Sequence, residues 1–188
     1  MNRNSALLLA AGEALRARKR RLGRLRRRIA LTVLGGGILL LCAAFPPRPR
    51  LVWNVSSSAP VGLYRVSPDA PLEPGDMVVA RVPADFRRLA AERRYLPMNV
   101  PLVKRVAAGP GDDVCAFGSV VLVNDRVVAR RRSADGAGRA LPAWSGCRRL
   151  RGRQLFLLMD SAASFDGRYF GVTDAADIIG KARLLWRR

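Results

Sequence analysis

The chain has 188 residues, with 34 Lys and Arg side chains against 14 Asp and Glu side chains and a formal net charge of +20. This length allows one moderate domain with an extra segment and excludes two large, well-packed domains. The charge favours an anionic partner, either nucleic acid or a membrane surface. The chain has no His, which excludes a Ser–His–Asp triad and a Cys–His dyad, and it has no paired Cys-x-x-Cys spacing. We therefore expect no metal site and no cofactor.

The first 45 residues place a basic segment before an apolar one. All ten of their Lys and Arg side chains lie within residues 1–28, together with the single acid Glu13, whereas residues 29–45 (IALTVLGGGILLLCAAF) carry no charge. Seventeen residues of helix span roughly 26 Å, close to the ~30 Å hydrocarbon core of a bilayer. This pattern predicts a membrane boundary at residue 28 rather than a nucleic-acid-binding arm.

Two alternatives exist for the apolar segment, because a buried core helix and the hydrophobic core of a cleavable signal peptide have similar lengths. The basic segment is unusually long for a signal peptide, and Cys-Ala-Ala at 42–44 is a weak cleavage signal. We therefore expect an uncleaved transmembrane anchor at 29–45. The excess of Arg in front of it predicts a cytoplasmic basic tail at 1–28 and an exported domain at 46–188.

The sequence after residue 50 consists of short β-rich runs, each closed by Gly, Pro or Asp. Many short strands separated by turn signals predict a mainly β domain, either a barrel or a pair of small sheets. A helix is expected at 84–94, an exposed loop at 130–139, and a tight hairpin turn at Asn124-Asp125 between two Val-rich runs. The expected strands are 51–55, 62–66, 77–81, 102–107, 113–116, 120–123, 126–129, 154–159 and 180–185.

The three cysteines fit this division of the chain. Cys42 lies in the apolar segment, where a thiol behaves as a small hydrophobe. Cys115 and Cys147 lie in the exported part, where oxidising conditions allow a disulfide. Two separate buried thiols are the alternative.

A serine hydrolase without His needs Lys or a carboxylate as its general base. A Lys amine has a pKa near 10.4 in water, so it must be desolvated to accept a proton at neutral pH. The chain has only three Lys (Lys19, Lys104 and Lys181) among many more Arg. Lys104 lies in the apolar run VPLVKRVAA, and Lys instead of Arg favours a titratable amine there, because Arg cannot be deprotonated. Taken alone, a Lys in a strand is usually just an edge charge.

The candidate nucleophiles form the cluster Ser56-Ser57-Ser58, which is followed by Ala59-Pro60. A serine cluster before Pro is ordinarily a turn. Residues 160–171 likewise fit a turn followed by an aromatic strand end. Neither segment indicates catalysis by itself.

Taken together and in order, these segments resemble the conserved boxes of the type I signal peptidase family, above all its conjugative-transfer branch of TraF-type maturation proteases. The resemblance covers about residues 48–188. It implies a mainly β, signal-peptidase-like catalytic domain after one transmembrane helix, with a hydrophobic groove for small residues before the scissile bond. The matching segments are 54–65 (NVSSSAPVGLYR), 101–106 (PLVKRV) with 110–112 (PGD), 118–124 and 164–171 (SFDGRYFG).

Carried over by position, the resemblance implies Ser58 as the nucleophile and Lys104 as the base that takes its proton. Ser56 would offer a hydroxyl to the oxyanion beside the backbone N–H of Ser58. General signal peptidases have Met after the nucleophile and Pro three residues after it, whereas here Ala59 follows and Pro60 is two positions on. That spacing suits the conjugative branch and leaves a choice among Ser56, Ser57 and Ser58, of which we favour Ser58.

The resemblance also implies three supporting roles. Ser164 would hydrogen-bond and orient the Lys104 amine. Asp166 and Arg168 would form a structural ion pair behind the site. Cys115 and Cys147 would correspond to a disulfide of the conjugative branch.

The implied function is a membrane-anchored serine endopeptidase of the bacterial inner membrane, single-pass, with its catalytic domain in the periplasm. Its partners would be the membrane and an exported precursor, either pilin-like or bearing a signal peptide, with no nucleic acid. The acyl-enzyme could be released by water or by an amine, and release by the pilin's own terminus would give a cyclic product. The sequence is compatible with both routes. A general housekeeping signal peptidase is the nearest alternative. A non-catalytic membrane-anchored assembly or nucleic-acid-handling protein of a secretion apparatus is the alternative from another class, because the exported part is itself basic.

Overall fold

The computed structural model describes the backbone of residues 3–44 and 48–188, and the side chains of residues 18–44 and 48–188. The chain divides into two compact units, Met1–Pro47 and Arg48–Arg188.

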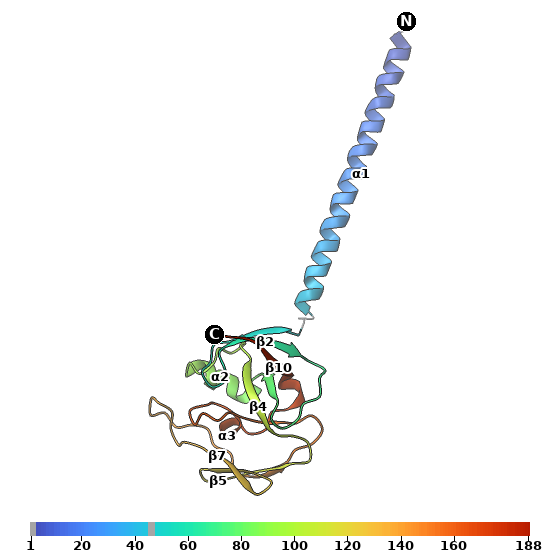
Figure 1. The fold of residues 1–188 in the computed structure, drawn as a ribbon. Coiled ribbons are helices and arrows are strands. Elements are labelled where there is room, and N and C mark those ends of the chain that lie inside the picture. The colour runs from blue at the N-terminus through green and yellow to red at the C-terminus, as the bar shows by residue number, and fades with distance from the viewer. Residues whose placement is uncertain (1–2, 45–47) are drawn as a thin grey trace. The chain divides into compact units, whose positions relative to one another are not determined.

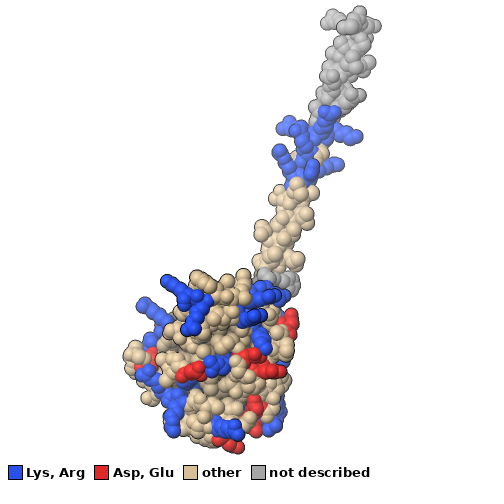
Figure 2. Space-filling view, in the orientation of Figure 1, with Lys and Arg blue, Asp and Glu red and all other residues tan. Residues whose placement is uncertain are grey.

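The first unit is a single helix, α1 (Arg3–Ala44), which continues without a break across the boundary predicted at residue 28 (Figure 1). Its part Arg18–Ala44 has the length and composition of a single-pass membrane anchor. Figure 2 shows a band of basic side chains on this helix, followed by an uncharged stretch. Within that stretch the Thr32 hydroxyl donates to the Arg28 carbonyl at 2.9 Å, so its polar group is satisfied by the helix itself. Phe45, at the end of the predicted anchor, lies outside the described residues.

The second unit contains two antiparallel sheets, so the mainly β prediction is confirmed and a pair of sheets forms (Figure 1). The six-stranded sheet has the order β1-β2-β10-β3-β4-β9, and the four-stranded sheet has the order β7-β6-β5-β8. The strands are β1 (Leu51–Asn54), β2 (Gly62–Ser67), β3 (Met77–Ala80), β4 (Leu102–Ala108), β5 (Asp113–Phe117), β6 (Val120–Val123), β7 (Arg126–Arg130), β8 (Gly146–Arg149), β9 (Phe156–Leu158) and β10 (Ile178–Arg187). The helical elements are α2 (Ala84–Glu92), α3 (Gly167–Phe170) and the 3-10 turn η1 (Ala175–Asp177).

All nine predicted strands and the helix at 84–94 are confirmed, with shifted ends. The hairpin between β6 and β7 is also confirmed, because Asn124 and Asp125 adopt positive φ angles of 47° and 63°, as a two-residue hairpin turn of this kind requires. The loop expected at 130–139 begins one residue later, because Arg130 ends β7, and residues 131–139 hold no regular strand and are largely exposed.

Three elements were not predicted: β8, α3 and the 3-10 turn η1. The sequence of β8, Gly-Cys-Arg-Arg, has no apolar alternation that would predict a strand. It is an edge strand that is held by its pairing with β5. A disulfide joins Cys115 of β5 to Cys147 of β8, its directly opposite partner. Residues 167–170 form a helical turn instead of the expected strand end, because the Asp166 side chain caps it by accepting from the Arg168 N–H.

The position of β4 inside the six-stranded sheet prepares the site. Its side chains alternate between two apolar clusters: Val103 packs in one, and Leu102 and Val106 pack in the other. Because alternate residues of a strand share a face, Lys104 lies on the same face as Leu102 and Val106. The strand therefore places the Lys104 amine among apolar side chains.

Candidate active site

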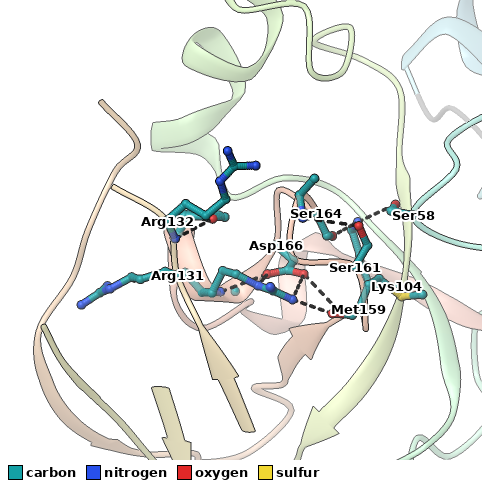
Figure 3. Close-up of polar contacts among 12 residues, drawn as sticks. Ser58, Lys104, Arg131, Arg132, Met159, Ser161, Ser164 and Asp166 are labelled. Atoms are coloured by element: carbon teal, nitrogen blue, oxygen red, sulfur yellow. Dashed lines mark hydrogen bonds and ion pairs between the residues drawn. The ribbon is translucent and has the colours of Figure 1, made fainter. Parts of the chain in front are cut away.

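Three segments that are far apart in the sequence meet at one place. Ser58 lies in the turn between β1 and β2, Lys104 lies in the middle of β4, and Ser164 lies in the loop between β9 and α3 (Figure 3). The register of β1 with β2 closes the turn, because Asn54 pairs directly with Gly62. The sheet thus fixes where the serine cluster emerges relative to β4.

The Lys104 amine is held between two hydroxyl groups. Its Nζ donates to Ser58 Oγ at 2.9 Å and to Ser164 Oγ at 2.7 Å (Figure 3). Lys104 is only 4% exposed, and Ser164 is also buried, whereas Ser58 is half-buried at the edge of a cavity. The two hydrogen bonds that the amine donates fix its position, with Ser164 on the buried side and Ser58 on the open side.

Burial lowers the pKa of Lys104 from 10.5 to about 8. The negative charge of Asp166 raises this pKa and the positive charge of Arg168 lowers it, both less strongly than burial does. Among the described residues, no carboxylate forms an ion pair with Lys104. The amine can therefore lose its proton close to neutral pH.

The three serines of the cluster differ in their contacts. Of the three, only Ser58 reaches Lys104 Nζ. Ser56 Oγ lies 3.0 Å from Ser58 Oγ and accepts a long hydrogen bond of 3.4 Å from the Ser58 N–H. Ser57 is exposed and lies between them in the sequence. The Ser58 hydroxyl therefore lies beside the Lys104 amine, whereas the Ser56 hydroxyl lies beside the Ser58 N–H.

Asp166 and Arg168 form a buried ion pair. Arg168 Nε donates to Asp166 Oδ1 at 2.8 Å and Nη2 donates to Oδ2 at 3.2 Å. Asp166 Oδ2 also accepts from the Met159 N–H at 3.0 Å, and Arg168 donates to the Met159 carbonyl. A Cβ at Gly167 would lie 2.7 Å from the Leu157 carbonyl oxygen, so only Gly lets α3 approach β9 this closely. These contacts fix the loop that carries Ser164.

A cavity of about 290 Å³ opens beside the Ser58 hydroxyl. Its wall combines apolar side chains, such as Leu96, Val100 and Phe165, with the polar groups of Tyr95 and Asp135. Asp135 accepts from the Tyr95 hydroxyl and from Arg139 Nε, so the loop at 130–139 folds back to close this side of the cavity. The cavity is large enough for several side chains of an extended peptide.

Sequence reasoning gave no role to Asn54, Tyr95 or Asp135. Asn54 lies at the end of a strand directly before a serine cluster, a pattern typical of an Asx turn, so this residue could have been singled out. Tyr95 and Asp135 carry no comparable local signal.

Comparisons with known proteins agree with the resemblance. The sequence profile of the family described as signal peptidase, peptidase S26, matches residues 25–187. A plasmid transfer protein TraF of Escherichia coli is 34% identical over 178 residues, which cover 88% of this chain and 100% of the relative. A conjugal transfer protein TraF of Agrobacterium fabrum (strain C58) is 36% identical over 139 residues, which cover 69% of this chain and 78% of the relative.

A solved signal peptidase I of Enterococcus faecalis V583 aligns with 61% of this chain and 98% of its own, at 17% sequence identity and a TM-score of 0.34. At that score the superposition carries no weight, and the assignment rests on the sequence matches. The chain is therefore a TraF-type member of the S26 signal peptidase family.

Proposed function

We propose that this protein is a membrane-anchored serine endopeptidase with Ser58 as nucleophile and Lys104 as general base. The observation that carries the proposal is the 2.9 Å hydrogen bond from Lys104 Nζ to Ser58 Oγ, in a chain that has no His. The pKa of Lys104 is lowered to about 8, so part of the amine is neutral near neutral pH and can accept the Ser58 proton. A purely structural or nucleic-acid-handling role gives no reason to bury a lone amine between two hydroxyls.

The reaction would be an acyl transfer in two halves. Ser58 Oγ attacks the scissile carbonyl while its proton passes to Lys104 Nζ, and the oxyanion accepts hydrogen bonds from the Ser58 N–H and the Ser56 hydroxyl. Lys104 then gives the proton to the leaving amine. Water then releases the acyl group as a linear product. Alternatively, the amino terminus of the substrate chain attacks the acyl group and releases a cyclic product, which is one water molecule lighter than the linear one.

The substrate that we propose is an exported, pilin-like precursor of a conjugal transfer system. The printed names of the relatives, plasmid transfer and conjugal transfer proteins, support this choice over a housekeeping precursor. The helix Arg18–Ala44 would anchor the enzyme in the bacterial inner membrane. We propose a cytoplasmic N-terminus because the basic side chains precede the uncharged stretch, and the catalytic domain would then face the periplasm.

Cleavage of a tagged precursor tests the proposal. Full-length protein in membranes is expected to process a pilin precursor encoded in the same operon, and the Ser58→Ala variant is expected to give no product. Ser57→Ala is the matched control, because the hydroxyl of this exposed neighbour makes no hydrogen bond to Lys104, and the variant should keep wild-type activity. Processing by an inserted, folded Ser58→Ala variant, or none by the wild type, would contradict the proposal. The mass of the product identifies water or an amine as the acceptor.

The pH dependence gives a second expected result. Protonated Lys104 cannot accept a proton, so kcat/KM should rise with pH along one ionisation with its midpoint near the Lys104 pKa of about 8, and should then level off. Initial rates of the purified full-length protein in detergent, from about pH 6 to about pH 10, measure the profile. A profile that falls above neutral pH would indicate a different ionising group.

A further inference from the structure

We propose that Asn54 is a positioning residue that holds the nucleophile turn in its reactive shape, an inference that rests on the proposed function. Asn54 is the last residue of β1 and is only 7% exposed. The turn that follows is exposed at Val55, Ser56 and Ser57, so burial does not fix its first half. Hydrogen bonds must determine the shape of that half.

The Asn54 side chain makes four hydrogen bonds, all to the backbone of this turn. Its Oδ1 accepts from the Ser56 N–H at 3.1 Å. Its Nδ2 lies within hydrogen-bond distance of three carbonyl oxygens, those of Ser56 at 2.9 Å, Ala59 at 3.2 Å and Pro60 at 3.1 Å, so its two N–H groups serve three acceptors and one N–H is shared. Because three carbonyls face the same atom of the amide, only its NH2 group can occupy that place, which fixes the orientation of the amide.

These bonds determine the geometry of the reacting groups. Both backbone groups of Ser56 are tied to Asn54, and Ser56 Oγ lies 3.0 Å from Ser58 Oγ. The Ser58 N–H, the second oxyanion donor, points toward the same Ser56 Oγ at 3.4 Å. Asn54 itself makes no hydrogen bond to Ser58 Oγ or to Lys104. Its effect on the reaction would therefore be exerted through the position of the turn.

The far end of the turn has an independent anchor. The Tyr64 hydroxyl donates to the Pro60 carbonyl at 2.8 Å, and Ala59 is buried. Loss of the Asn54 contacts should therefore displace Ser56 and Ser58 without detaching the turn from the domain. The expected defect is one of geometry at the nucleophile and not of folding.

The test is Asn54→Asp, which keeps the shape of the side chain and replaces its donor group by a carboxylate oxygen that faces three carbonyls. We expect kcat to fall by about 100-fold, the effect of a displacement of about 1 Å at reacting groups, and KM to change much less, because the apolar wall formed by Leu96, Val100 and Phe165 lies outside this turn. Kinetics of purified full-length protein on the tagged pilin precursor are measured beside the folded fraction, taken from thermal unfolding in detergent.

Asn124→Asp is the matched control. Asn124 also uses both ends of its amide at a turn, because it donates to Asp112 at 2.8 Å and accepts from the Asp113 N–H at 2.9 Å, but it lies in the β6–β7 hairpin. It should keep wild-type kcat and KM. Asn54→Ser, which removes the donors without adding charge, serves where the Asp variant does not fold, and the same fall in kcat is expected.

Three outcomes separate the possibilities. If kcat per folded molecule is unchanged in Asn54→Asp and Asn54→Ser, Asn54 is merely structural and the inference is overturned. An equal fall in Asn124→Asp overturns it as well. A wild type that is no faster than Ser58→Ala overturns the proposed function and this inference with it, whereas an active wild type leaves the proposed function standing when the Asn54 variants remain fully active.

Discussion

Replacing Lys104 by Met is expected to lower kcat by about 10⁴-fold or more, as much as Ser58→Ala does. Met keeps most of the side-chain length in the apolar layer but cannot accept the proton of Ser58. Because the two residues act as one unit, the double variant should be no slower than either single variant. Lys104→Arg should be equally inactive, since a guanidinium keeps the charge and does not deprotonate. Cleavage of the tagged pilin precursor by purified full-length protein measures all four.

Lys181→Met is the matched control for this prediction. Lys181 lies in β10 and its amine pairs with Asp76 at 2.8 Å, so it is the other Lys of the unit Arg48–Arg188 and has its own partner outside the site. This variant should keep wild-type kcat. If Lys104→Met is as active as Lys181→Met, the dyad is wrong and a carboxylate must serve as the base.

The sequence singled out Lys104 because of a local property that the fold then uses. A rare Lys stands in an apolar run, and such a run becomes a strand inside a sheet, where the amine is desolvated. The choice among three adjacent serines had no such basis, because only the folded turn decides which hydroxyl reaches Nζ. In the structure, Asn54 of β1 and Tyr64 of β2 both donate to the Pro60 carbonyl of the turn between these strands, and Ser58 of the same turn lies 2.9 Å from Lys104 Nζ.

The cavity wall was unpredictable for a different reason. The Tyr95 hydroxyl donates to Asp135, and the two residues are 40 positions apart in the chain. Neither the loop at 130–139 nor the segment after α2 has a pattern that indicates the other. The disulfide partners Cys115 and Cys147 are comparably distant, at 32 residues, but only a few cysteines could pair, and so the prediction was possible.

Removing the guanidinium of Arg168 is expected to lower the free energy of unfolding by about 3–5 kcal/mol, the usual effect of breaking a buried ion pair on one side. The side chains of Arg168 and Asp166 are 4% and 0% exposed, and they share two hydrogen bonds. Arg168→Met keeps much of the volume and leaves the Asp166 carboxylate buried without a counter-charge. Thermal unfolding of the purified full-length protein in detergent measures the loss.

The same variant should shift the pH profile of activity upward. The charge of Arg168 lowers the pKa of Lys104, and that of Asp166 raises it. Without Arg168, the remaining carboxylate stabilises the protonated amine, so the midpoint of kcat/KM should lie above pH 8. Activity per folded molecule would then be reduced at neutral pH and recovered at alkaline pH.

Two further variants identify the charge as the cause. Arg149→Met removes the same group from an exposed pair with Asp113, whose side chains are 60% and 49% exposed, and should cost about 0–1 kcal/mol. The double variant Asp166→Asn/Arg168→Met removes both buried charges and should recover much of the stability, because no unpaired charge is left. A double variant as unstable as Arg168→Met would place the loss in the contact between Arg168 and the Met159 carbonyl instead. The pair would then hold the Ser164 loop by its hydrogen bonds to the backbone of Met159, and its charges would matter only for the pKa of Lys104.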